Sequence, residues 1–304
     1  MVTASIAIIV PTLNAAGEWD RFAPPLLASV KPDDVLVLDS SSTDGTVELA
    51  REAGFRVHTI SRSEFNHGGT RQLALQLMPD AEILLFLTQD AILTNSNSIA
   101  LLLEAFCDKD VVAAFGRQMP RNGATAIETH ARLFNYSTRS NVRSLKDRAE
   151  LGFKTIFFSN SFGAYRRSAL EAVGGFPSDV IFGEDTITIA KLLLAGGKVA
   201  YVAEAKVLHS HPYTWRQEFR RYFDIGVLHV RESWLLREFG EARGEGGRFV
   251  RSELSYLWPQ NAPLILSAVV RTALKLLGYK LGRKEGMLSL GWKRRLSMHR
   301  EFWK

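Results

Sequence analysis

The sequence is poor in cysteine and in long hydrophobic runs, and both shortages exclude classes of protein. One cysteine, Cys107, stands among 304 residues, so no internal disulfide can form and a reducing compartment is expected. The apolar residues before it predict a buried thiol rather than a reactive one. The longest apolar runs, 83–87 and 264–270, are far shorter than the roughly 20 residues that span a bilayer. No signal peptide is recognised, because Pro11 and Asn14 interrupt the first apolar stretch, and we expect a protein that does not cross a membrane.

A glycine-rich turn is also missing after the first apolar run, residues 6–10, so the sequence has neither a P-loop nor a dinucleotide-binding fingerprint.

Positive charge is concentrated at the C-terminal end of the chain. The net charge is +6, but residues 271–304 hold ten Lys or Arg against two Glu, so this tail carries +8 and the rest of the chain −2. Such a tail is typical of contact with an anionic membrane surface or with nucleic acid, and a solvated charged end is the alternative.

Short apolar runs alternate with helical patterns in the first 115 residues. The alternation predicts an α/β fold with a mainly parallel sheet flanked by helices. We expect strands at 6–10, 35–38, 83–87 and 111–115, with helices at 46–53 and 70–78. Ligands of such sheets bind beyond the carboxyl ends of the strands, so the residues after each run are the first candidates for a site.

The later chain is expected to add a strand-like stretch at 159–167 and short strands at 199–202 and 207–209. A helix is predicted to begin just after the acidic pair Glu184-Asp185, at 186–194. Amphipathic helical patterns follow, and they predict a C-terminal helical extension. We expect its helices at 216–239 and 264–281, separated by a loop at 244–247.

Acidic and histidine side chains follow several of these strands. Asp39 ends the second strand, Asp90 follows the third, and His209 and His211 follow the last. Asp and His together are a reasonable ligand set for Mg²⁺ or Mn²⁺, with substrate phosphates completing the shell. Glu184 and Asp185 stand at a helix start, where they either serve chemistry or only cap the helix.

Taken in order, these motifs resemble the family 2 inverting glycosyltransferases of the GT-A fold, a Rossmann-like α/β architecture. That resemblance lies in residues 8–14, 38–46, 88–91, 174–176 and 183–185. Within the family the chain looks most like bacterial dTDP-rhamnosyltransferases of O-antigen and surface polysaccharide synthesis. The second likeness lies in residues 65–71, 115–118, 159–161, 209–211, 221–226 and 296–299.

The resemblance implies a catalytic domain at residues 1–212, an amphipathic helical region at 213–304 and a role for each candidate residue. Residues around the nucleotide are implied to be Pro11, Thr12, Asn14, Asp39, Ser41, Arg71 and Gln89. The implied metal ligands are Asp90 and His209, with His211 as a further candidate. Arg117, Asn160 and Ser161 are weaker candidates for the sugar or acceptor pocket. Two departures from the family stand out: Thr88 replaces the first carboxylate of the Asp-x-Asp motif, and serines occupy 40–42.

Inversion in a single displacement needs a base opposite the leaving group, and we expect Asp185 in this role with Glu184 as the second candidate. A carboxylate at a helix N-terminus stays ionised, which suits a base. The donor is expected to be dTDP-L-rhamnose, and a UDP- or GDP-sugar is the alternative. The expected acceptor is a lipid-linked saccharide.

We expect the enzyme to work in the cytoplasm, peripheral on the inner face of the bacterial plasma membrane. The basic tail would contact anionic lipid, with Trp292 and Trp303 as interfacial anchors. The alternative is that the helix at 264–281 packs on the protein. No nucleic-acid partner is expected, although a non-catalytic nucleotide-binding or nucleic-acid-binding protein remains a rival interpretation.

Overall fold

The computed structural model describes residues 4–241 and 244–304. Nine strands in this part of the chain form one sheet in the order β3-β2-β1-β4-β8-β6-β9-β5, with β7 paired to β9. The strands are β1 (Ile6–Thr12), β2 (Val35–Asp39), β3 (Arg56–Thr59), β4 (Ile83–Leu87), β5 (Ile92–Leu93), β6 (Val111–Met119), β7 (Asn141–Arg143), β8 (Phe162–Arg166) and β9 (Lys198–Leu208). The pairs β1–β2, β1–β4, β2–β3 and β6–β9 are parallel. The predicted α/β class is confirmed.

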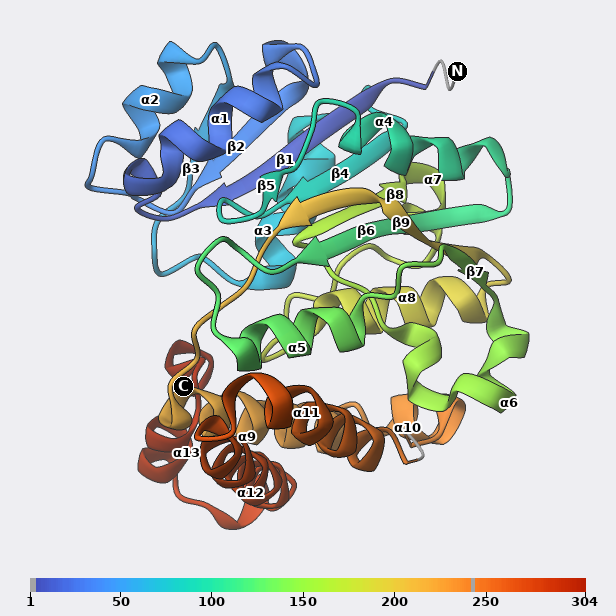
Figure 1. Cartoon of the computed structure of the whole chain (residues 1–304). Helices are drawn as coiled ribbons and strands as arrows, with labels where there is room; N and C mark the ends of the chain where they lie inside the picture. Colours follow the sequence, from blue (N-terminus) through green and yellow to red (C-terminus); the bar gives the residue numbers. More distant parts are fainter. Residues whose placement is uncertain (1–3, 242–243) are drawn as a thin grey trace.

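Helices cover both faces of the sheet, and a further helical group lies beyond one of these layers (Figure 1). The helices of the first two thirds of the chain are α1 (Trp19–Leu27), α2 (Thr46–Glu52), α3 (His67–Leu77), α4 (Ser98–Leu103), α5 (Ala126–Asn135), α6 (Arg148–Leu151), α7 (Arg167–Ala172) and α8 (Glu184–Leu194). Side chains of α1, α2 and α4 share a core with one face of the sheet, and those of α3 and α8 share another core with the opposite face. The central strands are buried on both faces, which explains their continuous apolar runs.

The C-terminal group consists of α9 (Trp215–Arg231), α10 (Ser233–Phe239), α11 (Glu245–Asn261), α12 (Leu264–Gly282) and α13 (Leu290–Leu296). Phe223, Val227 and Leu235 belong to the same core as α3 and α8, so this group packs on the α/β part. The change from strands to helices falls between Leu208 and Trp215. A division into two domains at 212 and 213 stays a prediction.

Helices α9 and α12 approach closely because glycines lie where they cross. A Cβ added to Gly282 would lie 2.0 Å from the carbonyl oxygen of Phe223, and one added to Gly278 would lie 2.3 Å from that of Phe219. Gly226 of α9 meets the carbonyl oxygen of Tyr279 in the same way. No side chain larger than hydrogen fits at these points, so backbone contacts hold this helix pair.

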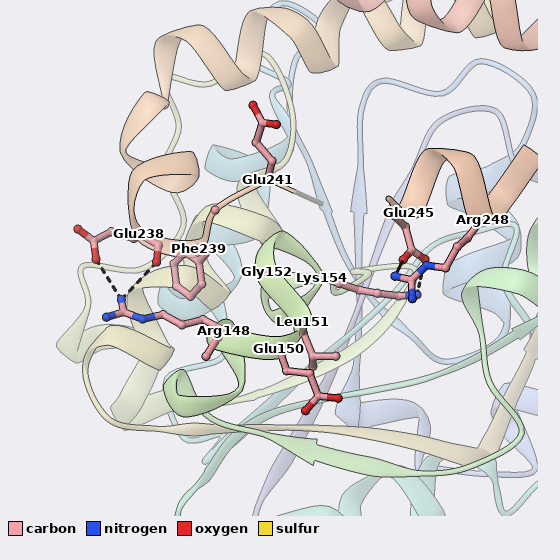
Figure 2. Close-up of a pocket in the computed structure, with 12 residues that line it drawn as sticks. Arg148, Glu150, Leu151, Gly152, Lys154, Glu238, Phe239, Glu241, Glu245 and Arg248 are labelled. Carbon is pink, nitrogen blue, oxygen red and sulfur yellow. Dashed lines mark hydrogen bonds and ion pairs between the residues drawn. The ribbon is translucent and has the colours of Figure 1, made fainter. Parts of the chain in front are cut away.

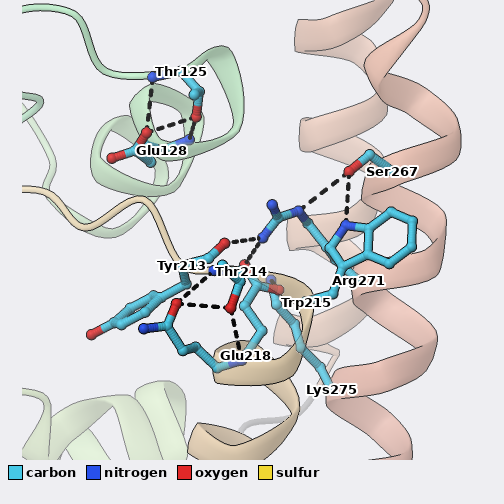
Figure 3. Close-up of polar contacts among 10 residues, drawn as sticks. Thr125, Glu128, Tyr213, Thr214, Trp215, Glu218, Ser267, Arg271 and Lys275 are labelled. Carbon is cyan, nitrogen blue, oxygen red and sulfur yellow. Dashed lines mark hydrogen bonds and ion pairs between the residues drawn. The ribbon is translucent and has the colours of Figure 1, made fainter.

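Polar contacts fix the other end of the α9–α12 pair (Figure 3). Arg271 Nη1 of α12 lies 2.8 Å from Glu218 Oε1 of α9 and donates to the carbonyl oxygen of Tyr213. Lys275 Nζ lies 3.4 Å from the other carboxylate oxygen of Glu218. These two cations hold the helices together, so they are not part of a free basic surface.

Several local predictions were wrong. The two short strands predicted at 199–202 and 207–209 are one strand, β9, which ends at Leu208. The predicted helix at 216–239 breaks at Glu232, and the predicted loop at 244–247 contains the start of α11, after Gly244 in a left-handed conformation. Cys107 is exposed, because it ends a short helical turn instead of continuing the apolar face before it.

Candidate active site

One acidic and two histidine side chains meet where β4 and β9 end. Asp90 Oδ2 lies 3.3 Å from His209 Nε2 and 3.5 Å from His211 Nε2, and the ligand atoms of the three residues all lie within 4.8 Å of one another. Divalent ions bind such atoms at about 2.0–2.2 Å. The three side chains are therefore close enough to bind one ion together, and the donor set suits Mg²⁺ or Mn²⁺.

The protonation of this cluster also suits a cation. Burial raises the pKa of the Asp90 carboxyl, but the two neighbouring imidazoles, His209 first, outweigh it and hold the pKa below its usual range. Burial and the neighbouring His209 lower the pKa of His211 to about 4. A carboxylate and a neutral imidazole are the forms that coordinate a metal.

The acidic pair lies at the first turn of α8, where Gly183 precedes it in a left-handed conformation. The helix begins at Glu184 and not at Thr186 as predicted, so both acids belong to its first turn. Glu184 is buried and forms a 2.9 Å ion pair with Arg71 Nη1 of α3. Its Oε1 also accepts a hydrogen bond from Asn160 Nδ2 at 3.0 Å. Burial raises the pKa of Glu184, but the charge of Arg71 outweighs it and lowers the pKa overall.

Asp185 differs from its neighbour because its side chain is half-buried and has no cationic partner among the described ion pairs. Its Oδ1 accepts a hydrogen bond from the backbone N–H of Thr186 at 2.7 Å, and its Oδ2 accepts one from the N–H of Asn160 at 3.4 Å. Burial and the negative charge of Glu184 raise the pKa of Asp185 to about 6. A carboxylate with this pKa is ionised at neutral pH and still able to take a proton.

A short turn, residues 159–161, joins the acidic pair to the metal cluster. Asn160 contacts both acids, as described above. On the other side, the carbonyl oxygen of Ser161 accepts a hydrogen bond from the N–H of Thr88, two residues before Asp90. The predicted site residues Asn160 and Ser161 therefore lie between the acidic pair and the metal cluster.

Loops after β1 and β2 form the part of the site that the resemblance assigns to the nucleotide. Asp39 is fully buried, and its carboxylate accepts hydrogen bonds from Thr12 Oγ1 at 3.0 Å and from the N–H of Ser42 at 2.8 Å. Pro11 and Thr12 lie in β1 beside Leu38 and Asp39 of β2. Asp39 thus organises the two loops, and a direct contact between its carboxylate and a nucleotide stays a prediction.

The same loops contain two non-glycine residues in the left-handed region, Asn14 at a φ of 51° and Ser41 at a φ of 58°. Asn14 Oδ1 accepts a hydrogen bond from the N–H of Thr43, and Ser41 Oγ donates to the carbonyl oxygen of Ile60. Both side chains are exposed. Gln89 makes two hydrogen bonds to the backbone of Leu13, at 2.7 and 3.1 Å. Backbone strain of this kind clusters at ligand sites, and here it accompanies three of the predicted nucleotide contacts.

Two predicted site residues are buried. Arg71 of α3 is paired with Glu184 and hydrogen-bonded to the carbonyl oxygen of His67, so it lies against the acidic pair. Its contact with a nucleotide stays a prediction. Arg117 is buried in β6 near Tyr201 and Glu204, and no contact joins it to the described site residues.

Three further residues of the site had no predicted role. Gln118 donates to Ser159 Oγ at 2.8 Å and accepts from His209 Nδ1 at 2.9 Å. Tyr165 donates to Asn160 Oδ1 at 2.7 Å from a fully buried position. The exposed Arg221 has its guanidinium carbon 5.7 Å from the ring centre of Tyr213, and that ring lies 5.3 Å from the ring of His211. Gln118 and Arg221 lie in segments that carry the resemblance, but no role could be assigned to them or to Tyr165, because only the folded chain brings β6, β8 and α9 to the cluster.

A cavity of about 300 Å³ lies away from this site, between α6 and the start of α11 (Figure 2). Several of its charged side chains pair with one another: Lys154 Nζ lies 2.7 Å from Glu245, and Arg148 Nη1 lies 3.2 Å from Glu238. None of the predicted site residues line it. We assign no function to this cavity.

Comparisons with known proteins agree with this geometry. The profile of "Glycosyl transferase family 2" matches residues 7–174. The chain is 47% identical to the O-antigen chain rhamnosyltransferase WbaN of Salmonella anatum, over 98% of this chain and 96% of that protein. It is also 47% identical to the O-antigen chain rhamnosyltransferase RfbN of Salmonella typhimurium, with the same coverage.

Among solved structures, the mannosyltransferase PcManGT of Pyrobaculum calidifontis, in complex with GDP-Man and Mn²⁺, is similar in fold. The TM-score is 0.57, the sequence identity is 19%, and the match covers 96% of this chain and 84% of the other. At this identity the likeness shows a common fold, and it says nothing further about the site of this chain.

Proposed function

The chain belongs to glycosyl transferase family 2, and from this premise we propose that it transfers L-rhamnose from dTDP-L-rhamnose to a hydroxyl of a lipid-linked oligosaccharide, with inversion. The two relatives with 47% identity are O-antigen chain rhamnosyltransferases, and they support this choice of sugar and acceptor class. The observation that carries the proposed chemistry is that one turn, 159–161, joins a metal-ligand cluster to a half-buried carboxylate.

In the proposed reaction Asp185 is the base. Its carboxylate takes the proton of the acceptor hydroxyl. The acceptor oxygen forms a bond to the anomeric carbon of rhamnose, and the bond between that carbon and the diphosphate oxygen breaks. Glu184 is a positioning residue, because its carboxylate is buried against Arg71 and Asn160. It keeps a negative charge beside Asp185, which favours the protonated form of Asp185 once the proton has been taken.

Asp90, His209 and His211 are proposed to hold Mg²⁺ or Mn²⁺. When bound, the ion would neutralise the negative charge that develops on the departing diphosphate. Arg221 is a further candidate to bind the diphosphate. Its exposed guanidinium lies over the ring of Tyr213, and that ring lies beside the ring of His211 in the cluster.

The proposed place of action is the cytoplasmic face of the plasma membrane. The described residues contain no helix that is long and apolar enough to cross a bilayer. The outward side of α12 nevertheless exposes large apolar side chains at helical spacing. They are Leu266, Val269, Leu276 and Leu277, and we call them the α12 stripe.

Exposed indoles and basic residues also occur in the C-terminal helices. Trp258 of α11 is 73% exposed and Trp292 of α13 is 54% exposed. Lys280, Arg283 and Lys284 are exposed near the end of α12. Apolar and indole groups beside exposed basic residues suit the interface of an anionic membrane. Trp303 was wrongly expected to be an anchor, because its ring is buried in the core.

The test of the proposed function is transfer by the purified chain from dTDP-L-rhamnose to a synthetic oligosaccharide on a lipid diphosphate, followed by mass spectrometry. UDP-glucose and GDP-mannose serve as competing donors, and EDTA is added in a parallel series. We expect a rhamnose-bearing product from dTDP-L-rhamnose that EDTA abolishes and Mn²⁺ restores. If a product forms faster from another donor, the sugar of that donor is the one transferred, and the proposed L-rhamnose is wrong. Transfer that is insensitive to EDTA would show that the reaction needs no metal ion.

A further inference from the structure

Gln118 has no place in the reaction proposed above, yet it is buried beside the metal cluster at the end of β6. The neighbouring backbone fixes its distance from His209. Gln118 lies opposite Val207 in the parallel β6–β9 pair, and the N–H of His209 donates to the carbonyl oxygen of Met119 at 2.9 Å. The side chain amide of Gln118 is thus held against the His209 ring by the sheet itself.

The two hydrogen bonds of the Gln118 amide determine its orientation. Its Nε2 donates to Ser159 Oγ at 2.8 Å, and the same oxygen accepts a hydrogen bond from the N–H of Ser161 at 3.3 Å. The amide oxygen therefore faces His209, and it lies 2.9 Å from His209 Nδ1. A carbonyl oxygen can only accept, so Nδ1 of His209 carries the proton.

This arrangement leaves the other nitrogen of His209 free to bind a cation. Nε2 then has a lone pair, and it lies 3.3 Å from Asp90 Oδ2 on the side of the cluster. Metal-binding histidines normally donate their second N–H to an oxygen acceptor, which fixes both the tautomer and the plane of the ring. In this chain a neutral glutamine provides that acceptor.

We propose that Gln118 is a positioning residue that fixes the tautomer and the orientation of His209, so that Nε2 faces a divalent cation bound with Asp90 and His211. The inference rests on the proposed metal-dependent function. Gln118 also connects the cluster to the turn that contacts Asp185, because Ser159 precedes Asn160 in that turn. The ligand to the metal and the proposed base are thus held by one hydrogen-bonded segment.

The test measures Mn²⁺ binding directly, in the presence of dTDP, from the electron paramagnetic resonance signal of free Mn²⁺. Gln118→Leu keeps a side chain of similar size without the acceptor, and Gln118→Glu keeps an oxygen acceptor. We expect Gln118→Leu to weaken Mn²⁺ binding about 10–100-fold, and Gln118→Glu to bind close to the wild-type protein. The matched control is Gln72→Leu, which removes a glutamine that accepts from the N–H of Phe176 away from the cluster.

A second measurement does not depend on how the variants fold. Long-range ¹H–¹⁵N spectra of the metal-free wild-type protein report which nitrogen of His209 carries the proton. We expect the Nδ1–H form, and an Nε2–H form would overturn the inference. Equal Mn²⁺ affinity of Gln118→Leu and wild type would also overturn it, as would equal weakening in the Leu and Glu variants. Failure of the wild-type protein to bind Mn²⁺ would instead overturn the proposed metal site and with it the premise of the inference.

Discussion

Glu184 and Asp185 are neighbours in the chain, but their surroundings give them opposite properties. Glu184 lies against the guanidinium of Arg71 and has a lowered pKa, whereas the pKa of Asp185 is raised by burial and by the charge of Glu184. Two carboxyl groups whose pKa values are pushed apart are typical of a division of roles. Asp185 is the group suited to exchange a proton, and Glu184 is the group that stays charged.

The first prediction concerns Asp185→Asn. An amide keeps the shape of the side chain but cannot accept the proton of the acceptor, so transfer should fall by about 10²–10⁴. Calorimetry should find dTDP binding close to that of the wild-type protein. Asp147→Asn is the control, because Asp147 caps a helical turn distant in sequence from the acidic pair. Turnover above about a tenth of wild type in Asp185→Asn would show that Asp185 is not the base.

The pKa of Asp185 also predicts a pH dependence. Since a base acts in its ionised form, kcat/KM should fall as the pH falls through about 6. Removing the charge of Glu184 removes one cause of the raised pKa of Asp185. In Glu184→Gln the acidic limb of the pH profile, where kcat/KM falls, should therefore move to lower pH. The profile is measured on protein that circular dichroism shows to be folded. A limb that stays in place in Glu184→Gln would assign the pH dependence to another group.

Part of the site could be predicted from single residues. Asp90, His209 and His211 were expected to meet because each follows a strand of the same sheet, and the structure brings them together. The pairing of Arg71 with Glu184 could not be predicted, because a helical position does not reveal which neighbouring element its side chain faces. Gln118 lies in the segment 115–118 that carries the resemblance, but its role was not predictable, since it depends on a hydrogen bond across 91 residues of sequence.

At the scale of whole elements, the crossing of α9 and α12 depends on three glycines and two cations. The glycines let the backbones touch, and Arg271 and Lys275 fix the register through Glu218. Because backbone atoms cannot move aside as a flexible side chain can, even one added methyl group at the crossing must displace a helix.

The prediction that follows is made for Gly282→Ala. The new Cβ would lie 2.0 Å from the carbonyl oxygen of Phe223, so the free energy of unfolding should fall by about 1–3 kcal/mol. Gly286→Ala is the matched control, because a Cβ there would meet no atom within 4 Å. Urea unfolding followed by tryptophan fluorescence measures both. Equal stability of the two variants would mean that the helices adjust to the methyl group.

Helices and strands were predicted well where one periodic pattern dominates the segment. They were predicted poorly where contacts between distant segments determine the structure. The run at 83–87 is β4 without change, and the pattern at 264–281 ends one residue before α12 does. In contrast, β3 and β7 are short and carry exposed residues, so no apolar run indicates them. The glycines at 244–247 suggest a loop, but Gly244 only begins α11, and the helix then packs on α5 and α12.

For the molecule as a whole, the α12 stripe and the exposed basic residues near its end predict binding to anionic vesicles. Each basic residue near anionic lipid contributes about 1 kcal/mol, and each buried leucine about 1.5–3 kcal/mol. Leu266→Ser combined with Leu277→Ser should therefore weaken sedimentation with anionic vesicles more than about tenfold. Added salt should weaken the binding of the wild-type protein.

The matched control for vesicle binding is Val142→Ser, a similarly exposed apolar side chain on β7. It should leave sedimentation unchanged. Equal binding to neutral and anionic vesicles would exclude the basic residues from the contact. Unchanged binding of the double variant would mean that the α12 stripe does not meet the lipid.

The glycine contacts between α9 and α12 give the two sides of α12 different roles. Because Gly226, Gly278 and Gly282 carry the packing from the inner side, the outer side of α12 has no part in holding the helix in place. The two sides of α12 can therefore be altered separately: a substitution among the exposed apolar residues of the outer side leaves the glycine crossing as it is.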